Sequence, residues 1–555
     1  MFSKIIRRSF CVARKNVWTP DNVVYSPYRD IEVPDTTIYE YVFRNLDKWA
    51  TKTAVVCGVT NRAYTFEELY KCSRTLGANL RKKFKLRDGD VIAILLPNVP
   101  EYPVSVFGVL AAGGIVTTIN PIYTPYEIQR QLDTSGAKIV ITLPDLVPNV
   151  KKSLELSKKD LKIIAVNIDS QQPEGTISFK ELTEDKHIDF EILKEVKRVS
   201  DDIAFMVYSS GTTGLPKAVE LTHTNKVANF SQQDTELRQY EYTTETNQDS
   251  TLGLLPLFHT YGLSVVMMHK LSVGLKLVTL PSFQPRTFLD ALLKHPMELM
   301  YLAPPTILFL GAHPAATRDH LKHLKVVTSG AAPLPEADIH KFLEKARPDI
   351  QFNQAYGMTE ASPLVTLGSR DFERNYSDVG CAVPNVQLRV VDADMKNLGP
   401  DEVGELPIKG PNVMRGYKDN PKANEEVFVD GRWYRSGDLA RINKDGIVTI
   451  VDRLKELIKV KGYQVAPAEL EAVLKEHADV YDAAVVGVPD PITGESPRAF
   501  VVLNKDSKVD EKLILDYVSE KVAAFKRLKS VTFVDSIPKN PSGKILRKVL
   551  KEQYC

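Results

Sequence analysis

The feature that most restricts how this chain folds is the alternation of helix-like and strand-like segments between residues 65 and 142. The pattern Thr65-x-x-Glu68 is a capping box, and it begins an apolar-periodic helix that we expect to extend toward Phe84. Short apolar strands are predicted at 91–96, 115–119 and 138–142, with helices at 101–113 and 125–135. Strands that alternate with helices in this way form a parallel sheet covered by helices. We therefore predict an α/β fold.

The length of 555 residues predicts at least two domains, since one hydrophobic core rarely organises a chain this long. Near Asp452 a charged stretch punctuated by glycine precedes a new set of elements. It comprises helices at 467–474 and 511–522 and strands at 482–488 and 498–503. We predict a large domain over 21–451, a hinge at 452–455 and a small, mobile α/β domain over 456–555. The charged, weakly patterned residues 151–199 are expected at the surface rather than in the core.

Composition excludes several classes of protein. Lys and Arg total 72 against 70 Asp and Glu, so the charge balance indicates no nucleic-acid partner. No apolar run reaches the roughly 18 residues that a transmembrane helix needs. The five cysteines are scattered without C-x-x-C spacing, which argues against a zinc site or disulfide framework and favours a reducing compartment. These are Cys11, Cys57, Cys72, Cys381 and Cys555.

The first twenty residues are basic, and the first acidic residue of the chain is Asp21. Apolar residues in this segment fall close to one helical face. This pattern predicts a mitochondrial targeting segment over 1–20 and a location in the matrix. A disordered basic tail on a cytoplasmic protein is the alternative. The final residues, Gln553-Tyr554-Cys555, are not an S-K-L-type signal, so a peroxisomal location would need another signal.

The segment Tyr208–Lys217, YSSGTTGLPK, carries the strongest chemical signal, and it follows a predicted strand at 202–208. Glycine lets a backbone approach phosphate closely, while hydroxyl groups and the lysine supply donors and positive charge. The spacing differs from that of a Walker A loop. The segment predicts a phosphate-binding loop, with a flexible surface loop as the alternative.

Four further segments carry weaker signals when each is taken alone. In QAYGMTE (354–360) an aromatic ring can stack on a base, and Thr and Glu can meet phosphate and Mg²⁺. In YRSGDLA (434–440) an Asp can accept both ribose hydroxyls, although a turn cap is the simpler interpretation. The segments 450–471 and 538–548 are cationic, which in isolation is typical of a solvated surface.

Taken together and in this order, the five segments resemble the adenylate-forming superfamily, particularly the branch of 4-coumarate–CoA ligase and firefly luciferase. The resemblance extends from about Thr36 to about Lys551. It implies a large N-terminal domain with parallel and mixed sheets and a small mobile C-terminal domain. It also implies an enzyme that activates a carboxylic acid with ATP and Mg²⁺ as acyl-AMP, releasing pyrophosphate, and then transfers the acyl group to coenzyme A.

The resemblance implies a nucleotide site in which the loop after Tyr208 holds the β- and γ-phosphates, Tyr356 stacks on adenine and Glu360 holds Mg²⁺. Thr359 would contact the α-phosphate, and an Asp–Arg pair would bind the ribose region. The implied ATP/AMP-binding set is Ser209, Ser210, Gly211, Thr212, Thr213, Gly214, Lys217, Gly330, Ala331, Ala332, Gln354, Tyr356, Gly357, Thr359, Asp438 and Arg453.

The same resemblance assigns the catalytic groups. Lys544 would bridge the carboxylate and the α-phosphate during adenylation, and Lys459 and Gln464 would be presented during thioester formation. Lys455 lies where the family has its hinge, and His259 resembles the gate beside the acyl carboxylate. The implied acyl pocket includes Tyr261, Val265, Tyr301 and Ile307, which suits a fatty acid or an aryl-propenoate.

Three other functions stay open at this point. A luciferase-like oxygenase shares the fold and the motifs. An amino-acid-activating enzyme is disfavoured because the segment 259–264, HTYGLS, has no carboxylate to pair an α-amine. A binding protein without activity is disfavoured because the charged motif residues are intact. The chain departs from the family pattern at Ala218 and Ala355, where the family commonly has glycine.

Overall fold

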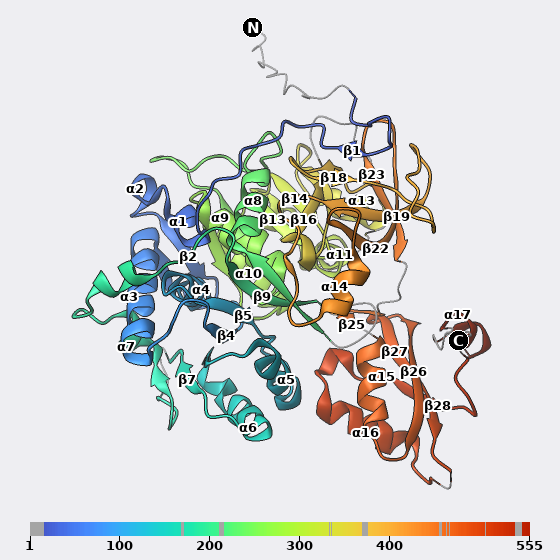
Figure 1. Ribbon diagram of the computed structural model, residues 1–555. Helices are drawn as coiled ribbons and strands as arrows, with labels where there is room; N and C mark the ends of the chain where they lie inside the picture. Colours follow the sequence, from blue (N-terminus) through green and yellow to red (C-terminus); the bar gives the residue numbers. More distant parts are fainter. Residues whose placement is uncertain are drawn as a thin grey trace.

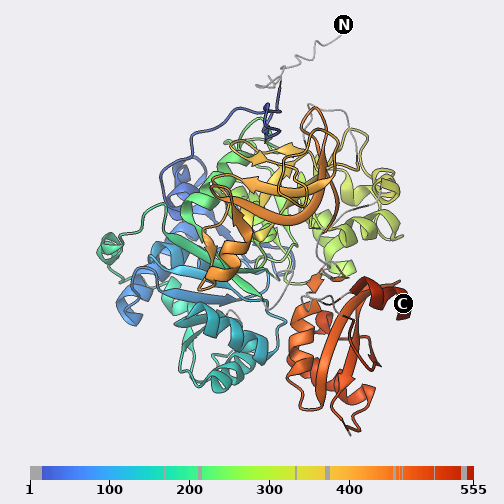
Figure 2. The ribbon, with the colours of Figure 1, turned by 45° about the vertical axis from the view of Figure 1, so that its right-hand side comes forward.

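The computed structural model describes residues 16–167, 171–209, 216–331, 334, 336–368, 376–453, 458–461, 463–465, 467–505, 507–538, 545 and 547–554. It shows a large lobe and a small C-terminal lobe, with the first described residues on the side of the large lobe away from the small one (Figures 1 and 2). Most of the predicted targeting segment lies outside the described residues. In the described part of the chain, no helix is long and apolar enough to cross a membrane.

An eight-stranded sheet contains the predicted alternation of strands and helices. Its strands follow the order β20-β10-β9-β5-β4-β6-β7-β8 and are parallel from β9 to β8. The antiparallel strands β10 and β20 extend one edge. The bounds are β4 (Val91–Leu95), β5 (Ile115–Thr118), β6 (Ile139–Thr142), β7 (Lys162–Ala165), β8 (Ile177–Ser178), β9 (Ile203–Ser209), β10 (Lys217–Thr222) and β20 (Gly416–Tyr417).

Helices α3 (Phe66–Phe84), α4 (Glu101–Ala111) and α5 (Pro125–Ser135) confirm the predicted helices. The Thr65 hydroxyl accepts the Glu68 N–H, and the Glu68 carboxylate accepts the Thr65 N–H, as a capping box requires. The helix ends at Lys85, whose left-handed φ of 57° stops the regular hydrogen bonding.

The expectation for residues 151–199 is wrong in one part. Strand β7 lies inside the eight-stranded sheet, and Ile163, Ile164 and Ala165 are buried. The strand begins with Lys162 and closely follows Lys158, Lys159 and Asp160, so these charged residues concealed the short apolar run after them.

A nine-stranded sheet lies beside the first, in the order β17-β16-β15-β14-β13-β11-β12-β2-β3. Strands β15, β14, β13, β11, β12 and β2 are parallel. The bounds are β2 (Thr53–Cys57), β3 (Ala63–Thr65), β11 (Ser250–Gly253), β12 (Lys276–Thr279), β13 (Leu299–Leu302), β14 (Val326–Ser329), β15 (Gln351–Gly357), β16 (Leu364–Leu367) and β17 (Cys381–Ala382).

A third, antiparallel sheet completes the large lobe. It follows the order β1-β18-β19-β22-β21, and β23 pairs with β22. The bounds are β1 (Val24–Tyr25), β18 (Gln387–Leu388), β19 (Gly404–Lys409), β21 (Phe428–Val429), β22 (Trp433–Ile442) and β23 (Val448–Arg453).

Shorter helices cover these sheets. They are α1 (Ile38–Phe43), α2 (Leu46–Trp49), α6 (Val147–Ser157), α7 (Phe179–Thr183), α8 (His223–Gln233), α9 (His269–Ser272), α10 (Pro285–Lys294), α11 (Pro304–Ala312), α12 (Arg318–Leu321), α13 (Glu336–Leu343) and α14 (Pro421–Val427), the 3-10 helices η1 (Pro144–Leu146), η2 (Phe190–Glu195) and η4 (Thr359–Ala361), and the π-helix η3 (Tyr261–Met268).

The small lobe has its own sheet and core. Its strands follow the order β25-β24-β27-β26, with β28 beside β27. Strand β23 belongs to the large lobe and β24 to the small one. The predicted hinge at 452–455 begins within the last two residues of β23, and the rest of it lies outside the described residues, so the hinge stays a prediction. The bounds are β24 (Ile458–Val460), β25 (Tyr463–Val465), β26 (Val480–Asp490), β27 (Gly494–Leu503), β28 (Ser530–Phe533), α15 (Pro467–Lys475), α16 (Glu511–Lys521), η5 (Ala524–Lys526) and α17 (Arg547–Tyr554).

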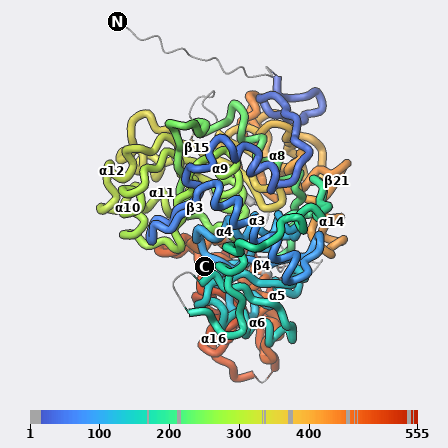
Figure 3. Tube along the Cα trace, turned by 90° about the vertical axis from the view of Figure 1, so that its left-hand side faces the viewer, coloured from blue at the N-terminus to red at the C-terminus, as the bar shows by residue number. Residues whose placement is uncertain are grey.

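The two lobes meet at the N-terminal end of α5, which contacts α16 (Figure 3). Lys526 of the small lobe is buried there, with Nζ 3.0 Å from Glu127 Oε1 of α5 and 2.9 Å from Glu469 Oε1 of α15. The Thr124 hydroxyl donates to the Lys521 carbonyl (2.9 Å), and the Tyr126 hydroxyl donates to Glu476 (2.7 Å). A buried ion pair therefore joins the lobes.

Candidate active site

The predicted nucleotide and acyl residues gather at the carboxyl ends of the parallel strands of the nine-stranded sheet. Gly330 and Ala331 follow β14, and Gln354 lies in the neighbouring β15, opposite Ser329. His259 follows β11, and Tyr301 lies near the end of β13. Ligands of open α/β sheets bind at this edge, because the loops after adjacent strands enclose a crevice there.

Three pairs of predicted site residues are direct cross-strand neighbours. Ser209 pairs with Lys217 at the two ends of the phosphate loop. Asp438 pairs with Arg453, and Lys459 pairs with Gln464. Directly opposite residues of an antiparallel ladder lie on the same face. The fold therefore brings together residues that the sequence separates.

The nucleotide segments are linked to each other by side chains. The Tyr356 hydroxyl donates to Asp438 Oδ2 (2.6 Å), which joins the adenine residue and the ribose residue of the prediction. The Gln354 amide donates to the carbonyl of Tyr376. At Gly357, a Cβ would lie 2.3 Å from the carbonyl oxygen of Pro363, so only glycine fits there. Ala331 has a left-handed φ of 74°, a conformation that is uncommon without glycine and is concentrated at functional sites.

Glu360 belongs to a buried group that the sequence analysis did not identify. The Tyr417 hydroxyl donates to Glu360 Oε1 (2.9 Å), and the Tyr417 and Tyr434 hydroxyls are 3.3 Å apart. Burial, together with the Glu360 carboxylate, raises the pKa of both tyrosines, which keeps Tyr417 protonated as a donor. Lys217 Nζ lies 4.8 Å from the centre of the Tyr417 ring, so the same tyrosine also contacts the phosphate loop. Tyr434 opens the YRSGDLA segment, and this position was the one available sequence signal.

His259 lies at an accessible position with protein packed around its ring. The surrounding protein, and secondly the charge of Lys226, lowers its pKa to about 4. The imidazole is therefore neutral at pH 7 and does not attract a carboxylate by charge. Lys226 is fully buried, and its Nζ donates to Ser264 Oγ (2.6 Å) and Thr260 Oγ1 (3.3 Å). Burial lowers the pKa of Lys226 to about 7.

Three of the four predicted acyl-pocket residues line one internal pocket: Tyr261, Val265 and Tyr301. Ile307 instead packs in a separate apolar cluster with residues such as Phe288 and Leu310. Gly330 leaves room for the Tyr261 ring, since a Cβ there would lie 3.0 Å from the ring edge. The lining residues are Gln233, Leu237, Gln239, Tyr240, Tyr261, Val265, Lys270, Tyr301, Thr328, Ala355, Leu364 and Leu367.

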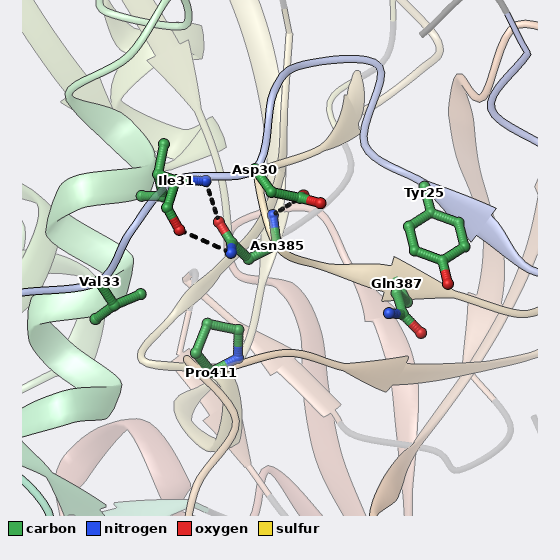
Figure 4. A pocket seen from close by; sticks show the side chains of 7 residues that line it. All are labelled: Tyr25, Asp30, Ile31, Val33, Asn385, Gln387 and Pro411. Atoms are coloured by element: carbon green, nitrogen blue, oxygen red, sulfur yellow. Dashed lines mark hydrogen bonds between the residues drawn. The ribbon is translucent and has the colours of Figure 1, made fainter. Parts of the chain in front are cut away.

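A second hollow lies away from these residues, between the N-terminal segment and β18 (Figure 4). Asn385 binds the Ile31 backbone there in both directions, at 2.9 and 3.0 Å, and its own N–H donates to Asp30 (3.1 Å). These bonds fasten the N-terminal segment to the large lobe. The hollow contains none of the predicted site residues.

Several predicted positions lie outside the described residues: Ser210, Gly211, Thr212, Thr213, Gly214, Ala332, Lys455 and Lys544. For Arg453 and Gln464 only the backbone position is described. Among the described residues, no group of three or more His, Cys, Asp or Glu side chains is arranged to hold a metal ion.

Comparison with known proteins identifies the family. The model of the AMP-binding enzymes matches residues 42–418, and the model of their C-terminal domain matches residues 469–544. The chain belongs to the AMP-binding enzyme family. The predicted superfamily and fold class are thereby confirmed. Among curated members of the family, the chain is 36% identical over 546 residues to 4-coumarate–CoA ligase 1 of Arabidopsis thaliana, covering 96% of each chain. It is 37% identical over 542 residues to 4-coumarate–CoA ligase 1 of Solanum tuberosum, covering 96% of this chain and 97% of that one.

This chain superposes better on some solved structures of AMP-binding enzymes than on others. The o-succinylbenzoate CoA synthetase of Bacillus subtilis, a double mutant bound to a product analogue, gives a TM-score of 0.78 at 26% identity. ATP-bound MatB of Rhodopseudomonas palustris gives 0.67 at 28% identity. The comparisons cover 94% of this chain and 99% of each structure. Sequence identity therefore does not explain the difference in superposition.

Proposed function

We propose that this protein is an acyl-CoA ligase that joins a carboxylic acid, a fatty acid or an aryl-propenoate, to coenzyme A through an acyl-AMP intermediate. The observation that carries the proposal is the convergence of Gly330, Tyr356 and Asp438 with the apolar pocket around Tyr261 at one edge of a parallel sheet. A nucleotide site and an acyl site thus share a boundary, at Gly330 and Ala355. The near full-length similarity to CoA ligases supports the same activity.

In the first step, the acid carboxylate attacks the α-phosphorus of ATP, and pyrophosphate leaves. Negative charge crowds at the reacting atoms, so positioning and charge stabilisation supply most of the catalysis. Lys217 at the end of the phosphate loop and Lys544 provide positive charge. The neutral His259 borders the path of the acyl carboxylate without trapping it as an ion pair.

Mg²⁺ fits this site through Glu360, because Mg²⁺ favours one or two carboxylates together with phosphate oxygens. Glu360 is buried, and Tyr417 fixes one of its oxygens. When bound, the ion would neutralise charge on the phosphates during displacement of pyrophosphate. Thr359, which is adjacent and 9% exposed, can reach the α-phosphate.

In the second step, the thiol of coenzyme A attacks the acyl carbon, and AMP leaves. The two steps need different groups at one centre, and rotation of the small lobe supplies them in turn. In Figures 1 and 2, β25 lies on the side of the small lobe that faces the large lobe. The hairpin β24–β25 carries the Lys459–Gln464 pair. This position of the hairpin supports assigning it to the thioester-forming step.

The activity is tested by measuring pyrophosphate release from ATP over a panel of carboxylic acids, with and without coenzyme A. We expect one class of acid to give release that rises with coenzyme A, and mass spectrometry to detect the matching acyl-CoA. Light emission with luciferin, ATP and oxygen in the absence of any acyl-CoA product would favour the oxygenase instead.

The division of labour is tested with Lys544→Ala. We expect adenylation to fall by about 100-fold or more, as for loss of a charged group that acts on the transition state. Thioester formation from supplied acyl-AMP should change little. Equal loss in both half-reactions would contradict the assigned role.

We also propose that residues 1–20 direct the protein to the mitochondrial matrix. The support is the basic, acid-free sequence of this segment. A fusion of residues 1–20 to a fluorescent protein should colocalise with mitochondria, and Arg7→Glu with Arg8→Glu should abolish this. A diffuse cytoplasmic signal from the unchanged fusion would refute the proposal.

A further inference from the structure

The acyl pocket contains a lysine that the mechanism does not use. Lys270 follows the π-helix η3 and is 1% exposed, yet it lines the pocket together with Tyr261 and Val265 from the same helical run. A π-helical stretch in an α-helical run is often found at functional sites. Lysine is almost never fully buried unless a negative group pairs with it. The position of this ammonium group therefore needs an explanation.

The described surroundings of Lys270 do not neutralise it. Its Nζ lies 2.9 Å from His269 Nδ1, and 5.0 and 4.7 Å from the ring centres of Tyr240 and Tyr301. Asp234 is the one described carboxylate that acts on it electrostatically, and no described carboxylate lies within ion-pair distance of it. A histidine nitrogen and two ring faces give partial compensation only.

Asp234 is already engaged by other groups. It accepts hydrogen bonds from the hydroxyls of Tyr240 (2.7 Å) and Tyr242 (2.8 Å), and it pairs with Arg44 at 3.9 Å. Burial lowers the pKa of Lys270 to about 7 despite this carboxylate. The charge of Asp234 therefore leaves the Lys270 ammonium short of a negative partner.

A second polar group of the pocket has unused donors. The Gln239 side chain is 6% exposed, and its Oε1 accepts from Thr328 Oγ1 (2.9 Å). Its Nε2 is buried and has no hydrogen-bond partner among the described residues. Leaving a buried donor unpaired is unfavourable, and an acceptor on a bound ligand would remove that penalty.

Three further polar side chains of the pocket already use a donor. The Tyr261 hydroxyl donates to the Thr328 carbonyl (3.2 Å), and the Tyr240 hydroxyl donates to Asp234. The Gln233 amide donates to the Asn229 carbonyl (2.9 Å). None of the described residues that line the pocket is acidic. The two buried groups that lack a matching partner, the Lys270 ammonium and Gln239 Nε2, are both donors, and they suit an acceptor with negative charge.

The two ends of the pocket differ in chemistry. Ala355 adjoins the adenine residue Tyr356, and Tyr261 packs against Gly330, so the reacting carboxylate belongs at this end. Lys270 lies nine residues after Tyr261 along the helical run, which places it about 10–14 Å further along the helix. The lysine is therefore available to the far end of a bound acyl group.

We propose that Lys270 and Gln239 form a subsite for an anionic oxygen group at the far end of the acyl substrate, so that this enzyme prefers acids with a second carboxylate. The inference rests on the acyl-CoA ligase activity proposed above and specifies its substrate class. One carboxylate carries two oxygens, and it can accept from the ammonium and the amide together while it supplies the missing charge.

The test compares matched acids in the full-length enzyme: octanoate with suberate, and cinnamate with 4-carboxycinnamate. We expect kcat/KM for at least one diacid to exceed that of its monoacid by about tenfold or more. Lys270→Met should reverse this preference, and Gln239→Leu should reduce it partly. Lys294→Met, at an exposed position of α10, serves as the matched control and should leave it unchanged.

Calorimetric binding of the same four acids to wild type and Lys270→Met separates the two proposals, since it requires no turnover. If a diacid binds more tightly than its monoacid and Lys270→Met abolishes this difference, the subsite is supported, even when no acyl-CoA forms. In that case only the proposed ligase activity fails. Preference for the monoacids, or a diacid preference that Lys270→Met leaves intact, would overturn the subsite.

Discussion

Two regions of this protein bury lysine side chains, and they treat the charge in opposite ways. Inside the large lobe, Lys226 and Lys270 have hydroxyl, carbonyl, imidazole or aromatic partners and no ion-paired carboxylate among the described residues. At the junction of the lobes, Lys526 contacts Glu127 and Glu469. Burial alone would lower the pKa of Lys526, but Tyr123 and the two carboxylates raise it above the ordinary value.

The presence or absence of a paired carboxylate distinguishes a lysine that holds the structure together from one whose charge is available to a ligand. At the junction, the positive charge is compensated by the protein, so it holds two surfaces together. In the large lobe the charge is left partly uncompensated, and burial lowers the pKa of both lysines to about 7. Such shifts are concentrated at functional sites because a substrate can complete the missing interaction.

The largest expected effect comes from removing the lysine whose charge the protein compensates. Lys526→Met leaves two buried carboxylates without their cation, and breaking a buried pair in this way costs about 3–5 kcal/mol. The β24–β25 hairpin rests on this region, since Tyr463 stacks on Phe525. Thioester formation from supplied acyl-AMP should fall by about 100-fold, while ATP–pyrophosphate exchange should change by less than about threefold.

The control for this variant is Lys521→Met, which removes a partly exposed cation from the same junction. Lys521 pairs with Glu476 at 2.8 Å, and an exposed pair contributes about 0–1 kcal/mol. A small effect on both half-reactions is expected. Equal losses in the two half-reactions of Lys526→Met would show that the ion pair does not select one arrangement of the lobes.

The next largest effect concerns Lys270, whose charge no carboxylate among the described residues pairs with, and it appears as a dependence of substrate preference on pH. Because the pKa of Lys270 is about 7, the ammonium form is present at pH 6 and mostly lost at pH 8.5. The groups that face it are neutral or fixed: burial holds the pKa of His269 far below 7, and burial raises the pKa values of Tyr240 and Tyr301. The ratio of kcat/KM for diacid over monoacid should therefore fall by roughly tenfold from pH 6 to pH 8.5.

In Lys270→Met this ratio should not depend on pH. Using a ratio at each pH cancels the pH dependence of adenylation itself. A ratio that rises with pH, or one that varies equally in wild type and variant, would contradict the assigned group.

A smaller effect is expected at the nucleotide site. Tyr417→Phe removes the hydrogen bond to Glu360, and a bond to a charged group contributes about 1.5–3 kcal/mol. Part of this loss should appear as a roughly three- to tenfold higher Mg²⁺ concentration for half-maximal pyrophosphate release. Tyr242→Phe, which loses a similar bond to Asp234 at an exposed position, should leave the Mg²⁺ requirement unchanged. An unchanged requirement in Tyr417→Phe would separate Glu360 from the metal.

The smallest effect concerns His259. Lys226→Met removes a nearby positive charge, which should raise the pKa of His259, but by less than about one unit, because the protein packed around the ring is the main cause of its low value. NMR titration of the imidazole measures this directly. A fall in this pKa would show that Lys226 does not act on His259 through its charge.

Much of the fold followed from local patterns. The capping box at Thr65, the buried strands β4 to β6 and the helices α15 and α16 of the small lobe were predicted, because each pattern lies within one element. The β7 strand was missed because the charged residues at and before its start concealed its short apolar run. Family membership and the ligase activity were predicted from five separated motifs and are confirmed. The residues of the site stay predictions at the level of their individual roles.

Lys226, Lys270 and Lys526 could not be selected from the sequence. Each stands beside residues that would fit a surface helix or a basic loop, as in HKL at 269–271 and FKR at 525–527. Burial depends on what packs against a residue from distant segments. For Lys526 the contacts come from residue 127, and for Lys270 they come from residues 240 and 301.

The sequence by itself determined the α/β class, the family and the nucleotide motifs, because hydrophobic periodicity and glycine-containing loops are local properties that chain neighbours specify. The tertiary structure alone decided which charged groups are buried and whether a carboxylate compensates them. Charge compensation depends on distances of a few ångströms between segments far apart in the chain, and in a medium of low polarity those distances set the pKa and the ligand that a site can take.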